Sequence, residues 1–235
     1  MIAVLLGVDS LFRVAQGRAI LWLRTHRLGW VDTYTVGLAV WLDRRYGWGL
    51  RLPWRRYVRH AKGEARFFVG YPIASPPPFV GEAWEALSPQ AQQYVRLLWA
   101  SEGKGRFDTS DVALVRTWWA DKKGYGITHA YLVAWRLVER GISHPLLEEV
   151  VRYAPLYFRQ VRSEDLCRDV AWEHLAFWAE SRQYRDLLRA RLQEGLRYQR
   201  PDGGFPYSCE EGAPSHLHTT LLAAWALSAY LETGL

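Results

Sequence analysis

A Pro-Asp-Gly-Gly turn near the C-terminus constrains the fold of this chain more than any other feature. Pro201 cannot continue the helical pattern that precedes it, and the Asp-Gly-Gly sequence at 202–204 favours a sharp turn. Ser215 is a suitable N-cap for the pattern that follows, in which apolar residues recur at helical spacing from His218 onward. The segment therefore predicts two helices joined by a tight turn that depends on glycine.

The rest of the chain shows the same helical periodicity, and no strand pattern exceeds it. Short turns separate the predicted helices, which span residues 2–25, 28–46, 82–100, 110–121, 127–138, 144–161, 164–181, 184–199 and 216–231. We expect Ser163 to cap the helix at 164–181. This succession of helices predicts an all-α protein.

The turn and its flanking helices resemble the repeat of the α/α-toroid proteins of the terpenoid cyclase and prenyltransferase class. That repeat has a helix ending in Gln, then Pro-Asp-Gly-Gly and an aromatic residue, then a helix of small and apolar residues. The matching residues are Gln199, Pro201, Asp202, Gly203, Gly204 and Phe205. The resemblance implies a partial or complete α/α toroid with alternating inner and outer helices. The chain lacks the Asp-x-Asp-Asp acid and the Asp-rich diphosphate-binding run, so the fold resemblance does not imply terpene chemistry.

Charge and proline content divide the chain into parts. Residues 1–66 contain twelve Lys or Arg and four Asp or Glu, whereas the remainder contains eighteen and twenty. Three consecutive prolines make residues 68–80 a stiff, extended linker. We therefore expect a basic N-terminal helical segment at 1–67, a Pro-rich linker at 68–80 and a toroid body at 81–235.

Within the basic segment, residues 51–66 interleave arginines with aromatic rings. Such a cluster suits an anionic partner, because guanidinium groups bind phosphate and rings stack on bases. The alternative interpretation of this cluster is a solvated connecting segment with snorkelling arginines. No nucleic-acid-binding motif accompanies the cluster.

The remaining composition favours a cytoplasmic protein. The N-terminus has no basic residues before its apolar stretch and reaches Asp9 early, so we expect neither a signal peptide nor a membrane span. Two cysteines, Cys167 and Cys209, are too few for a disulfide scaffold and leave one structural disulfide open. The absence of Asn is typical of a thermophile or of a GC-rich genome.

Three predicted helices carry groups near their starts that can bind a metal. His129 and His218 each open a helix, and Asp169 and Glu173 share a helix face because they are four residues apart. Imidazoles and carboxylates are ligands for zinc, iron or manganese. Inner helices of a toroid begin at one end of the barrel, so we expect all four residues to line one pocket. Asp169 and Glu173 are also candidate catalytic groups. Each motif taken alone is equally typical of a capping, packing or solvated residue.

The Thr-His, Asp-x-x-x-Glu and His-Thr motifs at 128–129, 169–173 and 218–219 also resemble an uncharacterised bacterial family of toroid proteins. That resemblance implies a common pocket and names no reaction.

Two other chemistries remain open. Lanthionine-forming peptide cyclases have a similar fold and hold zinc with two Cys and a His. Cys209 has suitable spacing to His216 or His218, so it is a candidate ligand or nucleophile, although the Cys-His-Gly sequence of those enzymes is absent. Sugar-cleaving α/α barrels need two carboxylates across a substrate, for which Asp202 with Glu173, or Asp111, would serve.

The leading hypothesis is a metal-dependent enzyme with a pocket at one end of the toroid. Its substrate would be a peptide or a small organic molecule, isoprenoid-like compounds included. The alternative is a non-catalytic helical scaffold that binds a protein or peptide partner, with the basic segment as a docking surface. Stoichiometric metal in the purified protein would distinguish the enzyme from the scaffold.

Overall fold

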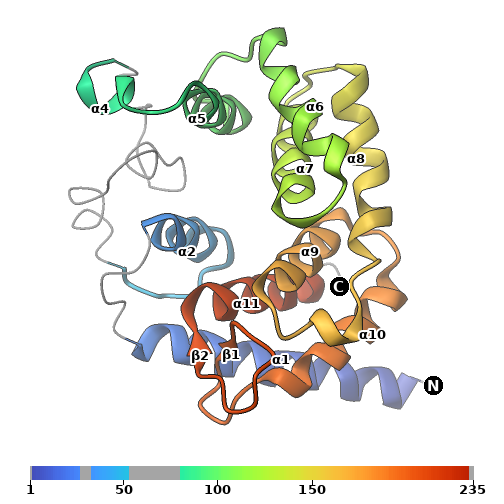
Figure 1. Cartoon of the computed structure of the whole chain (residues 1–235). Coiled ribbons are helices and arrows are strands. Elements are labelled where there is room, and N and C mark those ends of the chain that lie inside the picture. The colour runs from blue at the N-terminus through green and yellow to red at the C-terminus, as the bar shows by residue number, and fades with distance from the viewer. Residues whose placement is uncertain (1, 27–32, 53–79, 233–235) are drawn as a thin grey trace. The chain divides into compact units, whose positions relative to one another are not determined.

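The computed structural model describes residues 2–26, 33–52 and 80–232. In these ranges the chain is mostly helical, with one short β hairpin, which confirms the all-α prediction (Figure 1). The basic cluster at 51–66 and the linker at 68–80 fall almost entirely outside the described residues.

The chain divides into two compact units. The first comprises residues 1–29, 48–50 and 155–235, and the second comprises residues 30–47 and 51–154. The predicted N-terminal segment at 1–67 contributes to both units.

The first unit contains α1 (Ile2–Thr25), η3 (Ser163–Asp165), α9 (Asp169–Ser181), α10 (Arg185–Gly195), η4 (Leu196–Tyr198), β1 (Phe205–Pro206), β2 (Ser215–His216) and α11 (Leu217–Glu232). The second contains α2 (Thr33–Tyr46), α4 (Glu82–Glu85), α5 (Pro89–Ser101), η2 (Thr109–Asp111), α6 (Val112–Asp121) and α7 (Gly124–Glu139). Helix α8 (Pro145–Phe158) begins in the second unit and ends in the first.

Helix α11 is the core of the first unit. Every residue from 219 to 231 is buried, because the helix is apolar around its whole circumference and must be covered on all sides. Helices α1 and α9 pack along it, and α10 and the hairpin also contact it (Figure 1). On the α1 side, the ring of Phe12 meets that of Tyr230 edge to face at 5.2 Å, and Gln16 Nε2 donates to Ser228 Oγ at 2.7 Å.

Helices α9 and α11 run parallel to each other. Asp169 and His218 meet where the two helices begin, and further along both, the rings of Phe177 and Trp225 lie 4.8 Å apart. Helix α10 returns the chain between them, since a three-residue connection to α9 imposes an antiparallel hairpin. The first unit thus contains two parallel helices joined through a returning third.

The second unit repeats this arrangement. The rings of Tyr94 in α5 and His129 in α7 are 5.3 Å apart, and Glu102, just after α5, pairs with Arg136 near the end of α7 at 3.3 Å. Helices α5 and α7 are therefore parallel, and α6 joins α7 through two residues as an antiparallel hairpin.

The Pro-Asp-Gly-Gly turn packs directly against α1. Gln199 Nε2 donates to Ala15 O in α1 and to Gly203 O in the turn, both at 2.9 Å. Arg18 in α1 donates to two carbonyl oxygens at the start of the turn, those of Arg200 and Pro201. The turn signature therefore fixes α1 against the chain that leads into α11.

Asp202 holds this turn together. Its carboxylate accepts hydrogen bonds from Ser215 Oγ at 2.7 Å, from the Gly204 amide at 3.0 Å and from Trp22 Nε1 at 3.0 Å. Burial works against ionisation of Asp202, but these bonds outweigh it and lower the pKa of its carboxyl. Ser215 therefore supports the turn as a residue of β2. The prediction that Ser215 caps α11 is wrong.

Helix α1 is long, and one of its faces packs against other residues of the first unit. Phe12, Ala15 and Ala19 are buried in the first unit. Within the residues that the structure describes, no helix has both the length and the apolar composition needed to cross a bilayer.

The helix boundaries differ from the predicted ones where local capping chemistry intervenes. The predicted helix at 82–100 is interrupted before Pro89, where Ser88 Oγ accepts from the Ala91 amide and starts α5 anew. The predicted helix at 164–181 begins only at Asp169, and Ser163 bonds to a side chain of α10 instead of capping α9. The hairpin of β1 and β2 was not predicted, because two-residue strands carry no periodic signal.

Replacing Gly203 and Gly204 together with alanine should lower the melting temperature. Gly203 has φ +99°, and a Cβ there would lie 2.7 Å from Arg18 O, whereas a Cβ on Gly204 would overlap the Ser215 side chain. We expect a loss on the order of 1 kcal/mol or more at each position, measured by thermal denaturation. Gly17→Ala in α1 is the control, because its Cβ would meet no atom within 4 Å and alanine favours helix. An unchanged melting temperature in the double variant would show that the turn does not need glycine.

Candidate functional site

A carboxylate and an imidazole meet where α9 and α11 begin. Asp169 is the first residue of α9 and is buried, with 8% of its surface exposed. Its Oδ1 accepts from the Val170 amide at 2.8 Å, and its Oδ2 lies 3.2 Å from His218 Nδ1. A negative charge in the first turn of a helix is favoured by the helix dipole. The structure thus brings together two of the four predicted ligands, 49 residues apart in sequence.

This contact fixes the state of the His218 ring. When the imidazole is neutral, a hydrogen bond to Asp169 requires the proton on Nδ1, so Nε2 keeps its lone pair. The side chain of His218 is 25% exposed, which leaves it accessible to solvent. The pair therefore presents an oriented, basic nitrogen on a mostly buried support.

His216 lies two residues before His218, at the end of β2. Partial burial and the neighbouring charge of His218 lower the pKa of His216, and Asp169 acts in the opposite direction. The three groups are therefore electrostatically coupled. His216 Nδ1 is also 3.4 Å from Thr219 Oγ1, and its ring lies 5.0 Å from that of Tyr207.

Glu173 lies one turn after Asp169 on α9 and is buried, with 7% of its surface exposed. The four-residue spacing places both carboxylates on one side of the helix. A buried acid of this kind needs a polar or charged partner inside the protein. Glu173 thus lies on the same side of α9 as Asp169, one turn further along the helix.

His129 belongs to the second unit, where aromatic rings surround it. The rings of Tyr94, Trp118 and Tyr125 lie 5.3, 5.6 and 6.4 Å from its own. Burial among these rings lowers the pKa of His129 to about 4, so the imidazole is neutral at pH 7. His129 is thus a partly exposed histidine whose ring packs among three aromatic rings.

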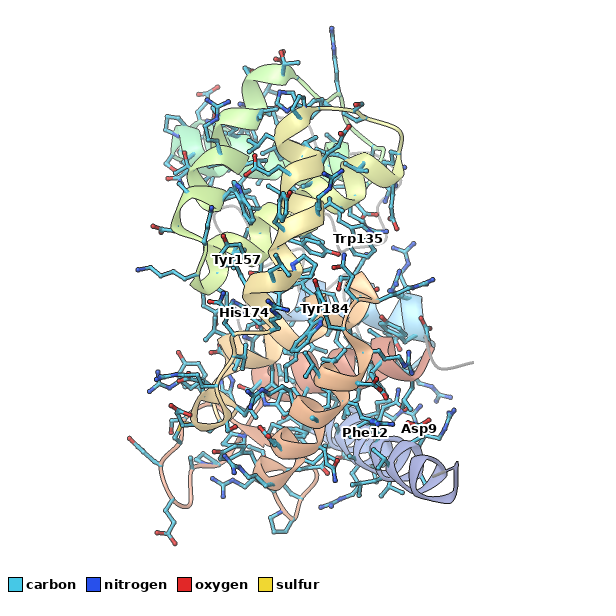
Figure 2. All side chains as sticks on the ribbon, turned by 90° about the vertical axis from the view of Figure 1, so that its right-hand side faces the viewer. Asp9, Phe12, Trp135, Tyr157, His174 and Tyr184 are labelled. Atoms are coloured by element: carbon cyan, nitrogen blue, oxygen red, sulfur yellow. A yellow bond between two sulfur atoms is a disulfide. The ribbon has the colours of Figure 1, made fainter. Side chains whose placement is uncertain are left out.

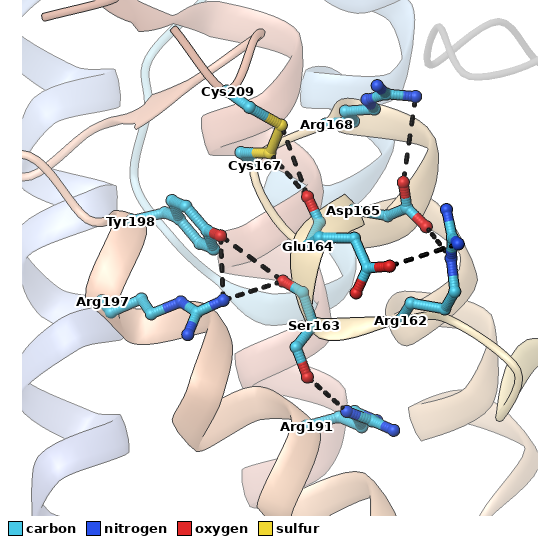
Figure 3. A network of polar contacts seen from close by, with 10 residues as sticks. All are labelled: Arg162, Ser163, Glu164, Asp165, Cys167, Arg168, Arg191, Arg197, Tyr198 and Cys209. Atoms are coloured by element: carbon cyan, nitrogen blue, oxygen red, sulfur yellow. Dashed lines mark hydrogen bonds and ion pairs between the residues drawn. A yellow bond between two sulfur atoms is a disulfide. The ribbon is translucent and has the colours of Figure 1, made fainter. Parts of the chain in front are cut away.

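Cys209 forms a disulfide with Cys167 (Figure 3). Cys167 is buried in the turn before α9, and Cys209 is exposed in the loop between β1 and β2. As a disulfide sulfur, Cys209 carries no thiolate, and the predicted role as ligand or nucleophile would require prior reduction. Disulfides are typical of oxidising compartments and of intracellular proteins of hyperthermophiles, and the cytoplasmic location stays a prediction.

The carboxylates considered for sugar cleavage have structural roles. Asp202 holds the Pro-Asp-Gly-Gly turn through three hydrogen bonds. Asp111 is buried and closes a capping box in which its side chain accepts from the Asp108 amide. Both carboxylates therefore support local structure, and a role in sugar cleavage stays a prediction.

A metal centre requires more ligands than the pair supplies. Within the described parts of the chain, no three or more His, Cys, Asp or Glu side chains are grouped so that they could hold a metal ion. Asp169 and His218 fit one feature of such a centre, since metal-bound imidazoles commonly donate their other nitrogen to a carboxylate. The predicted zinc, iron or manganese site stays a prediction.

The sequence analysis did not anticipate the polar network around Ser163, which links η3 to α10. Ser163 Oγ donates to Glu194 Oε2 and accepts from Arg191 Nη1, both at 2.7 Å, and Figure 3 shows Ser163 with Arg191. Arg191 also donates to Glu194, again at 2.7 Å. The i,i+3 spacing of Arg191 and Glu194 signals their own pairing, but the link to Ser163 spans 31 residues and has no local signal.

Comparison with known proteins gives no further constraint: no protein-family model, curated protein or solved structure matches the chain. The candidate site therefore depends on its geometry alone.

Replacing both cysteines with alanine should destabilise the protein. The disulfide closes a loop of 42 residues. In the chain-entropy model such a loop contributes about 4 kcal/mol by restricting the unfolded chain. Denaturant titration of the wild type with and without a thiol reductant, beside the double variant, would measure the loss. Equal stability of oxidised and fully reduced wild type would contradict the expectation.

His129 should make the protein less stable as the pH falls. Its pKa of about 4 in the folded state lies below the value of about 6.5 expected for an unfolded chain. The unfolded state therefore binds more protons in between, and stability is lost as pH falls from about 6.5 toward 4. His129→Gln should reduce the slope of melting temperature against pH in that window. His144→Gln is the control, and an equal slope in both variants would show that His129 is not buried as described.

Proposed function

We propose that this protein is an enzyme with an acid–base centre built on His218 and Asp169. The supporting observation is the 3.2 Å contact between His218 Nδ1 and Asp169 Oδ2, at the start of two parallel helices. A carboxylate that orients an imidazole is a recurring arrangement for proton transfer in enzymes. The substrate would be a peptide or a small organic molecule that reaches the exposed side of the pair.

The proposed framework is an α/α toroid, partial or complete. Its support is the repeated pattern of two parallel helices joined by a returning one, seen as α5, α6, α7 and again as α9, α10, α11. The Pro-Asp-Gly-Gly turn leads from the returning helix α10 into α11, as the resemblance to toroid repeats implies.

In the proposed mechanism, His218 Nε2 takes a proton from the substrate or from a water molecule. Asp169 holds the ring so that Nε2 faces away from the carboxylate, and it stabilises the imidazolium that forms. The positive ends of α9 and α11 favour the charge of Asp169. His216, coupled to both groups, is the second titratable residue at the centre. Hydrolysis and elimination are the reaction classes that such proton transfers serve.

A metal bound at His218 Nε2 would supply Lewis acidity to the same centre. It would need further ligands from the chain, and the described residues do not assemble them. The reaction steps above use only side chains of the protein. Elemental analysis of the purified protein separates the two versions of the centre.

The state of the His218 ring is the first test of the proposal. Nitrogen NMR should show the neutral ring with its proton on Nδ1, and Asp169→Asn should remove that preference. Modification by diethyl pyrocarbonate, located by mass spectrometry, should reach His218 several-fold more slowly in Asp169→Asn than in the wild type. His144 is the internal control, since its Nδ1 accepts from the Leu146 amide and is remote from Asp169 in sequence. Equal reactivity of His218 in both proteins would argue against an oriented base.

Loss of the pair should cost function without loss of the fold. Asp169→Asn should lower turnover of a hydrolysable or eliminating substrate, or affinity for a metal if one is found, by about 10- to 100-fold, because it removes the partner that orients the ring. His218→Gln removes the base itself and should lower turnover by about 100- to 10,000-fold. Circular dichroism and melting temperature should stay close to those of the wild type, because the contact is partly exposed. A protein that binds a partner equally well with both substitutions and turns over no substrate would instead be a scaffold.

A further inference from the structure

A partly open cavity in the first unit includes neither Asp169 nor His218 in its lining. It has a volume of about 410 Å³ and is lined by Arg159, Gln160, Trp178, Leu187, Ala190, Arg191 and Glu194. These residues come from the segment after α8, from α9 and from α10. Cavities of this size are typical of sites for small organic ligands.

Part of the wall of this cavity is apolar. Trp178 Nε1 donates to Gln183 O at 2.8 Å, so the polar atom of the indole is satisfied and the ring is fixed. Leu187 is 54% exposed, which is high for a large aliphatic side chain. Trp178 is only 1% exposed, so the apolar surface that a ligand would cover is that of Leu187 and Ala190.

The charged groups around the cavity are not equivalent. The carboxylate of Glu194 already accepts two hydrogen bonds, because Ser163 and Arg191 both donate to its Oε2 at 2.7 Å. The bond from Ser163, helped by the one from Arg191 and opposed by slight burial, lowers the pKa of Glu194 and keeps it ionised. The charges of Arg191 and Glu194 thus offset each other.

Arg159 differs from Arg191 because no carboxylate in the described part of the chain forms an ion pair with it. Its guanidinium carbon lies 5.1 Å from the ring centre of Tyr184. Tyr184, which Figure 2 labels, is the residue just before α10. This stacking orients the guanidinium and leaves its N–H groups available. The side-chain amide of Gln160, next in sequence, is a second donor at the cavity.

We propose that this cavity binds a small amphipathic carboxylate. The apolar part of the ligand lies against Leu187 and Ala190, and its carboxylate pairs with Arg159. A cationic head group is disfavoured, because the one carboxylate that lines the cavity, Glu194, is already bound by Arg191 and Ser163. This binding site does not rest on the proposed acid–base function.

Three probes with the same eight-carbon chain and different head groups test the proposal: octanoate, octanol and octyltrimethylammonium. Isothermal titration calorimetry of the whole protein should show one octanoate bound per chain. Octanol should bind on the order of tenfold more weakly, since it lacks the charge-assisted bonds to Arg159, and the cation more weakly still. Equal affinity for all three, or no saturable binding of octanoate, would overturn the proposal.

Matched variants then locate the site. Arg159→Gln should reduce octanoate affinity about tenfold, to the level of octanol, and leave octanol binding unchanged. Arg152→Gln removes an exposed arginine seven residues earlier, on α8 and outside the cavity, and should leave octanoate binding unchanged. Ala190→Trp should fill the cavity and abolish binding of octanoate and octanol. Wild-type affinity for octanoate in Arg159→Gln or in Ala190→Trp would show that it binds elsewhere, provided that both variants keep the wild-type circular dichroism.

Discussion

The fold of the first unit depends on the burial of α11. A helix that is apolar on every side cannot remain at the surface, so other elements must cover its whole circumference. Helix α1 and the C-terminal helices α9 and α10 supply that cover, although α1 stands at the opposite end of the sequence. The Pro-Asp-Gly-Gly turn makes this arrangement specific, since Gln199, Arg200 and Pro201 all accept or donate hydrogen bonds with α1. Burial thus drives the association, and the turn fixes its register.

The Asp169–His218 pair follows from the same burial. Because α9 packs parallel to α11, residues at the start of one helix meet residues at the start of the other. Both first turns also have unsatisfied backbone N–H groups, which favour a carboxylate there. Asp169 therefore lies where a negative charge is favoured, and its other oxygen faces the imidazole of His218.

The sequence predicted those features that local chemistry determines. Helix α1, at residues 2–25, has the predicted bounds, and the glycine turn at 202–204 behaves as its residue types require. The joint placement of Asp169 and His218 was also predicted, although only from the resemblance to toroid repeats. Features that join distant segments could not be predicted in this way. Packing brings Ser163 to Glu194 and places His216 beside the pair. The aromatic rings around His129 come from three helices, α5, α6 and α7.

The pair is a product of the fold and contributes little to holding the fold together. A partly exposed contact between a carboxylate and an imidazole stabilises a protein weakly, so it cannot by itself bring two helices together. The disulfide constrains the segments that carry both residues of the pair. Cys167 lies two residues before Asp169, and Cys209 lies in the loop that leads to β2 and His218. The disulfide therefore ties together the two segments that carry the pair and limits their relative motion. Side chains held in place by other interactions, and not needed for stability, are those that a protein can use for chemistry.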